Sequence, residues 1–152
     1  MAEDRDLMFM RAALELAAEA RAAGEVPIGA VVVREGEIVG RGMNHTILDS
    51  DPTAHAEMVA LRAAAKAIGN YRLVGCEMFA TLEPCAMCAG ALIHARIERL
   101  VYAAADPKAG AAGSVLNVVN HERLNHRMSV ESGVMGEEAA DMLQKFFRER
   151  RK

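Results

Sequence analysis

The stretch "IGAVVVREGEIVGRGM", residues 28–43, decides the fold class of this chain. Residues 28–33 are apolar and mostly β-branched, which predicts a short buried strand. The residues "REGE" around Gly36 predict a tight turn, and residues 37–43 predict a returning strand. Strands joined by so short a turn are antiparallel, so the sheet that contains them cannot be entirely parallel.

Helical and strand-like patterns alternate on both sides of this hairpin. Apolar residues recur at helical spacing before it, and short β-branched runs separate Ala-rich segments after it. The expected helices are 4–23, 54–68, 85–95 and 137–151, and the further expected strands are 77–81, 99–104 and 127–132. This alternation predicts an α/β fold, a three-layer α/β/α sandwich with a mixed five-stranded sheet. In the last helix we expect Ala140, Leu143 and Phe147 to face the core.

Length and composition suit one domain over residues 1–152. The chain is 52% hydrophobic and 26% charged, as is typical of globular proteins. The longest clean apolar stretch, residues 85–93, is far shorter than the roughly 20 residues of a membrane-spanning helix. The acidic N-terminus lacks the order of a secretory signal. We therefore expect a cytoplasmic protein without a membrane partner.

Two short motifs predict a metal site. "PCAMC", residues 84–88, places Cys85 and Cys88 on one face at the start of a helix, where the positive helix end favours thiolates. "DPTAHAE", residues 51–57, places His55 and Glu57 at the start of another helix. If the two helix starts meet, one imidazole and two thiolates supply three ligands for a tetrahedral Zn²⁺ with an open position for water. Such an ion lowers the pKa of water to about 7, and Glu57 can carry the proton.

Other interpretations of the cysteines remain. Two cysteines at this spacing also suit a redox dithiol, and a closed structural zinc site would need a fourth ligand. The spare candidates for that ligand are Cys76, His94, His121 and His126. None of them lies at a tight partner spacing, and Cys76 fits better as a buried residue at a strand start. The pairing of the two motifs favours a catalytic site.

The motifs His55-Ala56-Glu57 and Pro84-Cys85-Ala86-Met87-Cys88 resemble the signature of the zinc-dependent cytidine and adenosine deaminase superfamily. The stretches "EVPIGAVVV", "NYRL", "GAAGS", "NHR" and "FFRERR" extend the likeness along nearly the whole chain to bacterial tRNA-specific adenosine deaminases of the TadA type.

That resemblance implies a cytidine-deaminase-like fold and conversion of adenosine to inosine at the wobble position of tRNA anticodons, in arginine tRNA in typical bacteria. It implies a homodimer that binds the anticodon stem-loop, with one zinc ion per subunit held by His55, Cys85 and Cys88. Glu57 would carry the proton. Asn44 would contact the target nucleotide, and Asp106 would lie near its ribose. Pro107 departs from the expected alanine and restricts the backbone of the residue before it.

The C-terminal stretch "KFFRERRK", residues 145–152, combines five basic residues with two aromatic ones on a chain of net charge −3. Phosphate contacts and stacking on bases need this combination. The candidate tRNA contacts are Phe146, Phe147, Arg148, Arg150 and Arg151. The alternative is a solvated helix end with Phe147 in the core, although two adjacent aromatics on a helix cannot both face inward.

Two other functions remain open from the sequence. The same chemistry could act on a free base or nucleoside, namely guanine, cytosine or cytidine. A non-catalytic, zinc-stabilised RNA-binding protein is the alternative from another class. Glu57 and the lack of an obvious fourth ligand argue against it.

Overall fold

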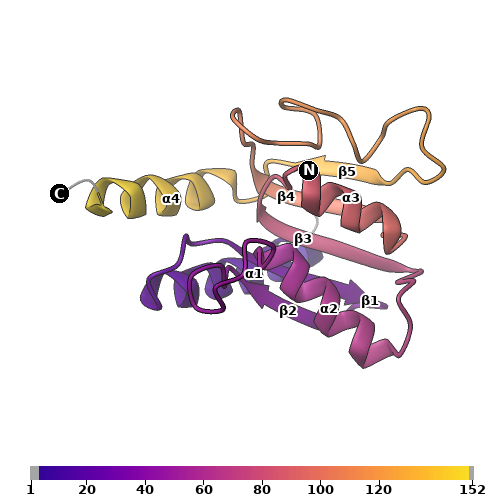
Figure 1. The fold of residues 1–152 in the computed structure, drawn as a ribbon, viewed down its shortest axis with the longest axis horizontal. Helices are drawn as coiled ribbons and strands as arrows, with labels where there is room; N and C mark the ends of the chain where they lie inside the picture. Colours follow the sequence, from indigo (N-terminus) through magenta and orange to yellow (C-terminus); the bar gives the residue numbers. More distant parts are fainter. Residues whose placement is uncertain (1–3, 151–152) are drawn as a thin grey trace.

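The computed structural model describes residues 4–150, which form four helices and five strands (Figure 1). In chain order the elements are α1 (Asp4–Ala22), β1 (Gly29–Arg34), β2 (Glu37–Met43), α2 (Ala56–Ile68), β3 (Cys76–Leu82), α3 (Ala86–His94), β4 (Arg99–Ala104), β5 (Ser129–Ser132) and α4 (Gly136–Arg150). Each element lies within two residues of its predicted bounds. No helix within residues 4–150 is long and apolar enough to span a membrane.

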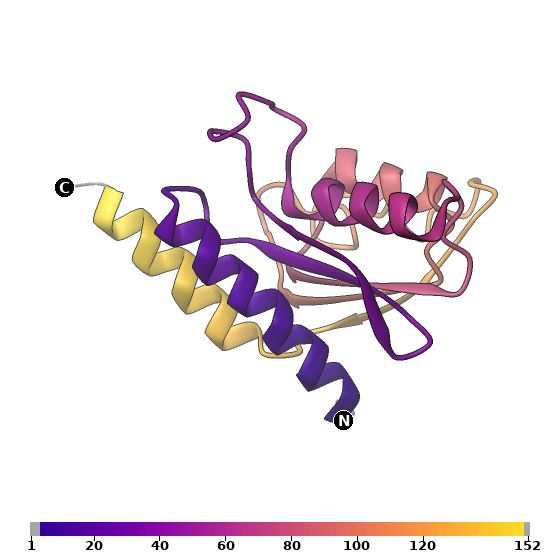
Figure 2. The same cartoon turned by 90° about the horizontal axis from the view of Figure 1, so that it is seen from below.

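The five strands form one mixed sheet in the order β2-β1-β3-β4-β5. β1 pairs antiparallel with both β2 and β3, whereas β3, β4 and β5 run parallel. α1 and α4 lie side by side on one face of the sheet, and α2 and α3 cover the other (Figure 2). The predicted three-layer α/β/α sandwich with a mixed sheet is confirmed.

The core consists of two apolar layers, one on each face of the sheet. Val31 and Val33 of β1 pack toward α1 and α4, while Ala30 and Val32 pack toward α2 and α3. Successive residues of a strand point to opposite faces, and both faces of β1 are covered. This explains why residues 28–33 read as a continuous apolar run instead of an alternating one.

Two glycines of β2 let α2 lie unusually close to the sheet. A Cβ atom at Gly40 would overlap the carbonyl oxygen of Ala60, and one at Gly42 would overlap that of Ala56. Only a residue without a side chain permits this approach of a helix backbone to a strand. Because Ala56 is the first residue of α2, the contact at Gly42 sets the position of the N-terminal end of this helix.

The predicted inner face of α4 is wrong. Phe146 is buried, with 6% of its surface exposed, whereas Phe147 is 44% exposed. Contacts with the end of α1 set the rotation of α4: Arg150 donates a hydrogen bond to the carbonyl of Gly24, and its guanidinium lies 4.7 Å from the centre of the Phe146 ring. The apolar spacing within α4 is compatible with either rotation, so only these tertiary contacts distinguish them.

Asp6 of α1 forms an ion pair between this helix and the sheet. Its buried carboxylate accepts a hydrogen bond of 2.6 Å from Arg99, which also donates to Glu77 at 2.9 Å. The hydrogen bond from Arg99 lowers the pKa of Asp6. Burial raises the pKa of Glu77, but hydrogen bonds from Arg5 and Arg99 outweigh burial and lower it. Both carboxylates therefore stabilise the fold above their ordinary pKa values of 3.8 and 4.5, and lose this contribution as the pH falls through the lower folded values.

We expect Arg99→Met to lower the free energy of unfolding by about 3 kcal/mol at pH 7, because it leaves the Asp6 carboxylate buried without its partner. The variant should also lose less stability than the wild type between pH 5 and 3. Urea denaturation at both pH values measures this. Arg11→Met is the matched control, since Arg11 is an exposed residue of α1. Equal stability of the two variants would contradict the role of Arg99.

Candidate metal centre

His55 and Cys85 occupy the same position in two different helices. Each is the N-cap residue, His55 of α2 and Cys85 of α3, with extended backbone angles of φ −70°, ψ 154° and φ −76°, ψ 178°. An N-cap side chain usually accepts a hydrogen bond from the first turn, but neither of these does. Both side chains are thus free to project beyond the helix tips.

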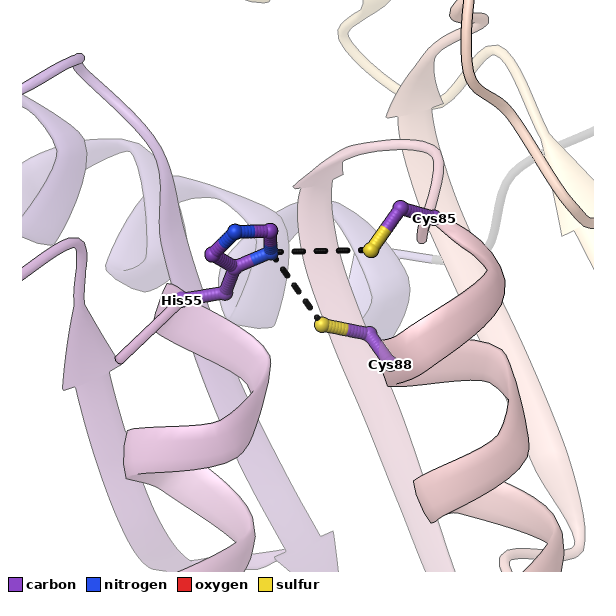
Figure 3. Close-up of side chains that lie close together, drawn as sticks. All are labelled: His55, Cys85 and Cys88. Atoms are coloured by element: carbon purple, nitrogen blue, oxygen red, sulfur yellow. Dashed lines mark hydrogen bonds between the residues drawn. The ribbon is translucent and has the colours of Figure 1, made fainter. Parts of the chain in front are cut away.

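The two helix starts meet, as the sequence predicted. Nδ1 of His55 lies 3.6 Å from Sγ of Cys85 and 3.5 Å from Sγ of Cys88 (Figure 3). A nitrogen and a sulfur bound to one tetrahedral zinc ion would be about 3.6 Å apart, given Zn–S and Zn–N bonds of about 2.3 and 2.0–2.1 Å. The three ligand atoms all lie within 4.8 Å of one another. These three residues, His55, Cys85 and Cys88, form the metal group, which is therefore positioned for a metal ion.

The group holds these three ligands and no fourth among the residues that the structure describes. The spare candidates lie elsewhere: Cys76 is fully buried as the first residue of β3, and Nε2 of His126 lies 2.7 Å from the carbonyl oxygen of Ile97. The prediction for Cys76 is confirmed. Three protein ligands leave one position of a tetrahedral ion for water or substrate, which is typical of catalytic sites.

The two thiols and the imidazole are close enough to change one another's pKa values. Hydrogen bonds from Cys88 and His55 lower the pKa of Cys85 to about 3, so this sulfur is a thiolate at neutral pH. The same hydrogen bond, together with burial, raises the pKa of Cys88. The hydrogen bond to Cys85 also raises the pKa of His55. Two cysteine sulfurs and one imidazole nitrogen are donors that suit zinc.

Glu57 is a buried acid beside this group. It lies in the first turn of α2 and is only 4% exposed. Burial raises the pKa of Glu57 to about 7, although the nearby His55 lowers it in part. Glutamate is rarely buried without a partner, and Glu57 forms no ion pair with any residue between 4 and 150. Its position fits a side chain that transfers protons.

Asn44 lies in the loop that leads to His55 and is 5% exposed. Its Nδ2 donates hydrogen bonds to Glu25 and to Thr46, at 3.4 and 3.3 Å. Glu25 is fully buried and belongs to none of the motifs that predicted the site. The only available signal was its charge in the stretch "EVPIGAVVV", immediately before a buried strand.

Asp106 and Phe147, which were predicted separately, line one groove. The groove has a volume of about 560 Å³ and lies between α4 and the loop after β4. Asp106 caps its own turn, because its Oδ1 accepts hydrogen bonds from the backbone of Lys108 and Ala109 at 3.0 and 3.2 Å. Pro107 suits this turn: it needs no N–H there, and it favours extended backbone in the residue that caps.

The residues of α4 that were predicted to contact tRNA differ in their exposure. Phe147 and Arg148 are exposed, whereas Phe146 packs beneath Arg150. The guanidinium of Arg150 is bound to the carbonyl of Gly24. Arg151 lies outside the described residues. We therefore retain Phe147 and Arg148 as the candidate contacts for a partner at this end of the chain.

The fold and this site define a deaminase, and residues 4–151 match the family of MafB19-like deaminases. Within that class, the chain belongs to the family of tRNA-specific adenosine deaminases. It is 52% identical over 147 residues to the tRNA-specific adenosine deaminase of Haemophilus influenzae, with 96% of this chain and 85% of the relative covered.

Two solved structures resemble this chain, and the first supports the assignment. One comes from work on A-to-I editing by tRNA:A34 deaminases at the wobble position of transfer RNA. It matches with a TM-score of 0.87 and 44% identity, covering 90% of this chain and 99% of that one. The guanine deaminase of Bacillus subtilis matches with a TM-score of 0.65 and 41% identity, covering 74% of this chain and 71% of that one. Deaminases of tRNA and of a free base thus share this fold.

Proposed function

We propose that this protein is a zinc-dependent hydrolase that converts adenosine to inosine at the wobble position of a tRNA anticodon. The observation that carries the proposal is the meeting of His55, Cys85 and Cys88 beside the buried Glu57. These residues would hold a zinc ion, which would supply a hydroxide nucleophile near neutral pH by lowering the pKa of bound water to about 7.

The reaction replaces the amino group on C6 of adenine with oxygen from water and releases ammonia. Both protons of the water must therefore leave it: one ends on N1 of the purine ring and the other on the departing nitrogen. Glu57 is the proposed carrier, because a carboxylate can take each proton in turn and deliver it as a carboxylic acid. Its burial supports this role, since few waters compete for the proton in such a site.

The proposed substrate contacts come from two loops and one helix. Asn44 would bind the target nucleotide, and Asp106 would lie near its ribose. The groove between Asp106 and Phe147 would take a neighbouring base of the unpaired anticodon loop, with the Phe147 ring as a stacking surface. Lys108, which also lines the groove, and the exposed Arg148 offer positive charge for phosphates. Positive charge at this place can bind phosphates although the chain as a whole carries a net charge of −3.

The resemblance also supports a homodimer with one zinc ion per subunit, and action on tRNA supports a cytoplasmic location. Analytical ultracentrifugation and metal analysis of the same sample would test the dimer and its zinc content. A monomer with full activity on tRNA would contradict the proposed assembly.

A free base or nucleoside is the second candidate substrate, favoured by the likeness to guanine deaminase. Incubating the protein with an anticodon stem-loop that carries adenosine at the wobble position, and separately with guanine, cytidine and adenosine, distinguishes the two. We expect inosine in the stem-loop, read as guanosine on sequencing, and no ammonia from the free compounds. Ammonia from guanine alone would support the second candidate, and no product in either arm would favour a non-catalytic RNA-binding protein.

We expect Phe147→Ala to raise the KM for the stem-loop about tenfold, because stacking on an aromatic ring contributes about 1–3 kcal/mol per base. The metal content should not change, since Phe147 lies on α4 and not at the helix starts that form the metal group. Steady-state kinetics measure the effect. Tyr71→Ala is the matched control, because this exposed tyrosine lies beyond the far end of α2 from His55. The same KM in wild type and Phe147→Ala would exclude stacking at this site.

A further inference from the structure

Two glutamates outside the metal group are buried and point at backbone, not at basic side chains. Glu25 is 0% exposed and Glu83 is 2% exposed. Neither forms an ion pair with any residue in the range 4–150. A buried carboxylate without a cation is costly unless hydrogen bonds satisfy it, so the donors around each one indicate its role.

The carboxylate of Glu83 is the centre of the loop 106–114. Oε1 accepts a hydrogen bond from the backbone N–H of Asp106 at 3.0 Å, and Oε2 accepts from the N–H groups of Ala112 and Ser114 at 2.9 and 3.1 Å. The Ser114 hydroxyl donates to Oε1 as well. A Cβ atom at Gly110 would overlap the carboxylate, so the loop closes tightly around it.

Glu25 does the same for the loop after β2. Its Oε2 accepts hydrogen bonds from the backbone N–H groups of Ile47 and Leu48 at 3.0 and 2.7 Å. Its Oε1 accepts from the side chains of Asn44 and Thr46 at 3.4 and 3.3 Å. Bonds to a charged acceptor are about twice as strong as neutral ones, so each carboxylate restrains its loop firmly.

Both restrained loops are linked to the metal group, one along the chain and the other through hydrogen bonds to the segment before Cys85. The loop held by Glu25 begins at Asn44 and leads to His55, while Glu83 stands two residues before Cys85. The loop held by Glu83 also donates from the N–H of Ala111 to the carbonyl of Pro84 at 2.8 Å. Glu25 therefore holds the loop that carries Asn44 and leads to His55. Glu83, two residues before Cys85, holds the loop that carries Asp106.

We propose that Glu25 and Glu83 are positioning residues: each buried carboxylate holds one loop in a fixed place beside the metal group, and so aligns Asn44 or Asp106 with the bound nucleotide. The holding of the loops follows from the contacts alone. The alignment of substrate rests on the proposed function.

The test uses the full-length, zinc-loaded protein and the variants Glu83→Gln and Glu25→Gln. Glutamine keeps the shape of the side chain but replaces one acceptor oxygen with a donor, so some backbone N–H groups lose their partner. Hydrogen exchange of single amides, measured by NMR, reports the loss. In Glu83→Gln we expect the amides of Ala112 and Ser114 to exchange at least about tenfold faster, and those of Ile47 and Leu48 to stay unchanged.

In Glu25→Gln we expect the reverse pattern, so each variant is the control for the other loop. Glu15→Gln, at an exposed position of α1, should change neither loop. If a glutamine variant fails to fold, Ser114→Ala and Thr46→Val each remove one hydroxyl donor and leave the carboxylate in place. These milder variants should speed exchange in the same loop by a smaller factor.

Kinetics separate positioning from general stability. With the stem-loop as substrate, we expect a KM about tenfold higher in each glutamine variant, with unchanged zinc content and a smaller change in kcat. Unchanged exchange in the target loop, or faster exchange throughout α2 and α3 with loss of zinc, would overturn the proposal. If the wild type is inactive on the stem-loop but exchange follows the expected pattern, the proposed substrate fails and the loop-holding role stands.

Discussion

Replacing Glu57 with glutamine is expected to reduce inosine formation at least about a thousandfold while zinc stays bound. Glutamine has the shape of glutamate but cannot take up or release a proton, and a positioned acid–base group contributes about 10²–10⁴ to the rate. Because Glu57 is buried without an ion pair among residues 4–150, the neutral amide should not weaken the fold. Sequencing of the treated stem-loop and metal analysis of the protein measure both effects.

Glu15→Gln serves as the control for Glu57, since it makes the same chemical change at an exposed site. Glu57→Ala should behave like Glu57→Gln in activity and zinc content, although it also leaves a small cavity. An active glutamine variant with full zinc content would remove Glu57 from the proton transfer and leave the metal group without its acid–base partner.

Replacing Cys88 with alanine is expected to remove both zinc and activity. Two ligands cannot complete a tetrahedral site, and Cys88 is the buried member of the group. In the wild type, free zinc at a hundred times its Kd should add up to about 2.7 kcal/mol to the free energy of unfolding, because the three ligands are brought together only in the folded protein. The Cys88→Ala variant should show no such response in denaturation with and without added zinc.

Cys76→Ala is the matched control for Cys88. It also removes a buried thiol, but Cys76 lies at the start of β3 and outside the metal group. This variant should keep the zinc and its stabilising effect, with only the general loss expected for a small cavity. Full zinc content in Cys88→Ala, or loss of zinc in Cys76→Ala, would contradict the ligand assignment.

The fold was largely predictable because its signals are local. The apolar run 28–33, the turn at Gly36 and the alternation of helices with strands depend on neighbouring residues, and the structure follows them. The rotation of α4 was not predictable, because a contact between Arg150 and Gly24, 126 residues apart, decides it. The ion pair of Asp6 with Arg99 crosses 93 residues and has no local signal either.

The metal group was predictable for a related reason. Its ligands come from only two short motifs, each at a helix start, so one assumption about how two helices meet brings all three together. Glu25 and Glu83 could not be found in this way. Their partners are mostly backbone N–H groups 22 to 31 residues away, and any residue type supplies such a donor.

The two glycines of the edge strand β2 affect the metal group, because they determine how closely α2 packs on the sheet. Any side chain at Gly42 would overlap the start of α2 and force it, and His55 with it, to shift. A separation of 3.5 Å between nitrogen and sulfur tolerates little such movement before an ion loses one of its ligands. The placement of the three ligand atoms therefore depends on the one hydrogen atom that Gly40 and Gly42 each carry where another residue would have a Cβ atom.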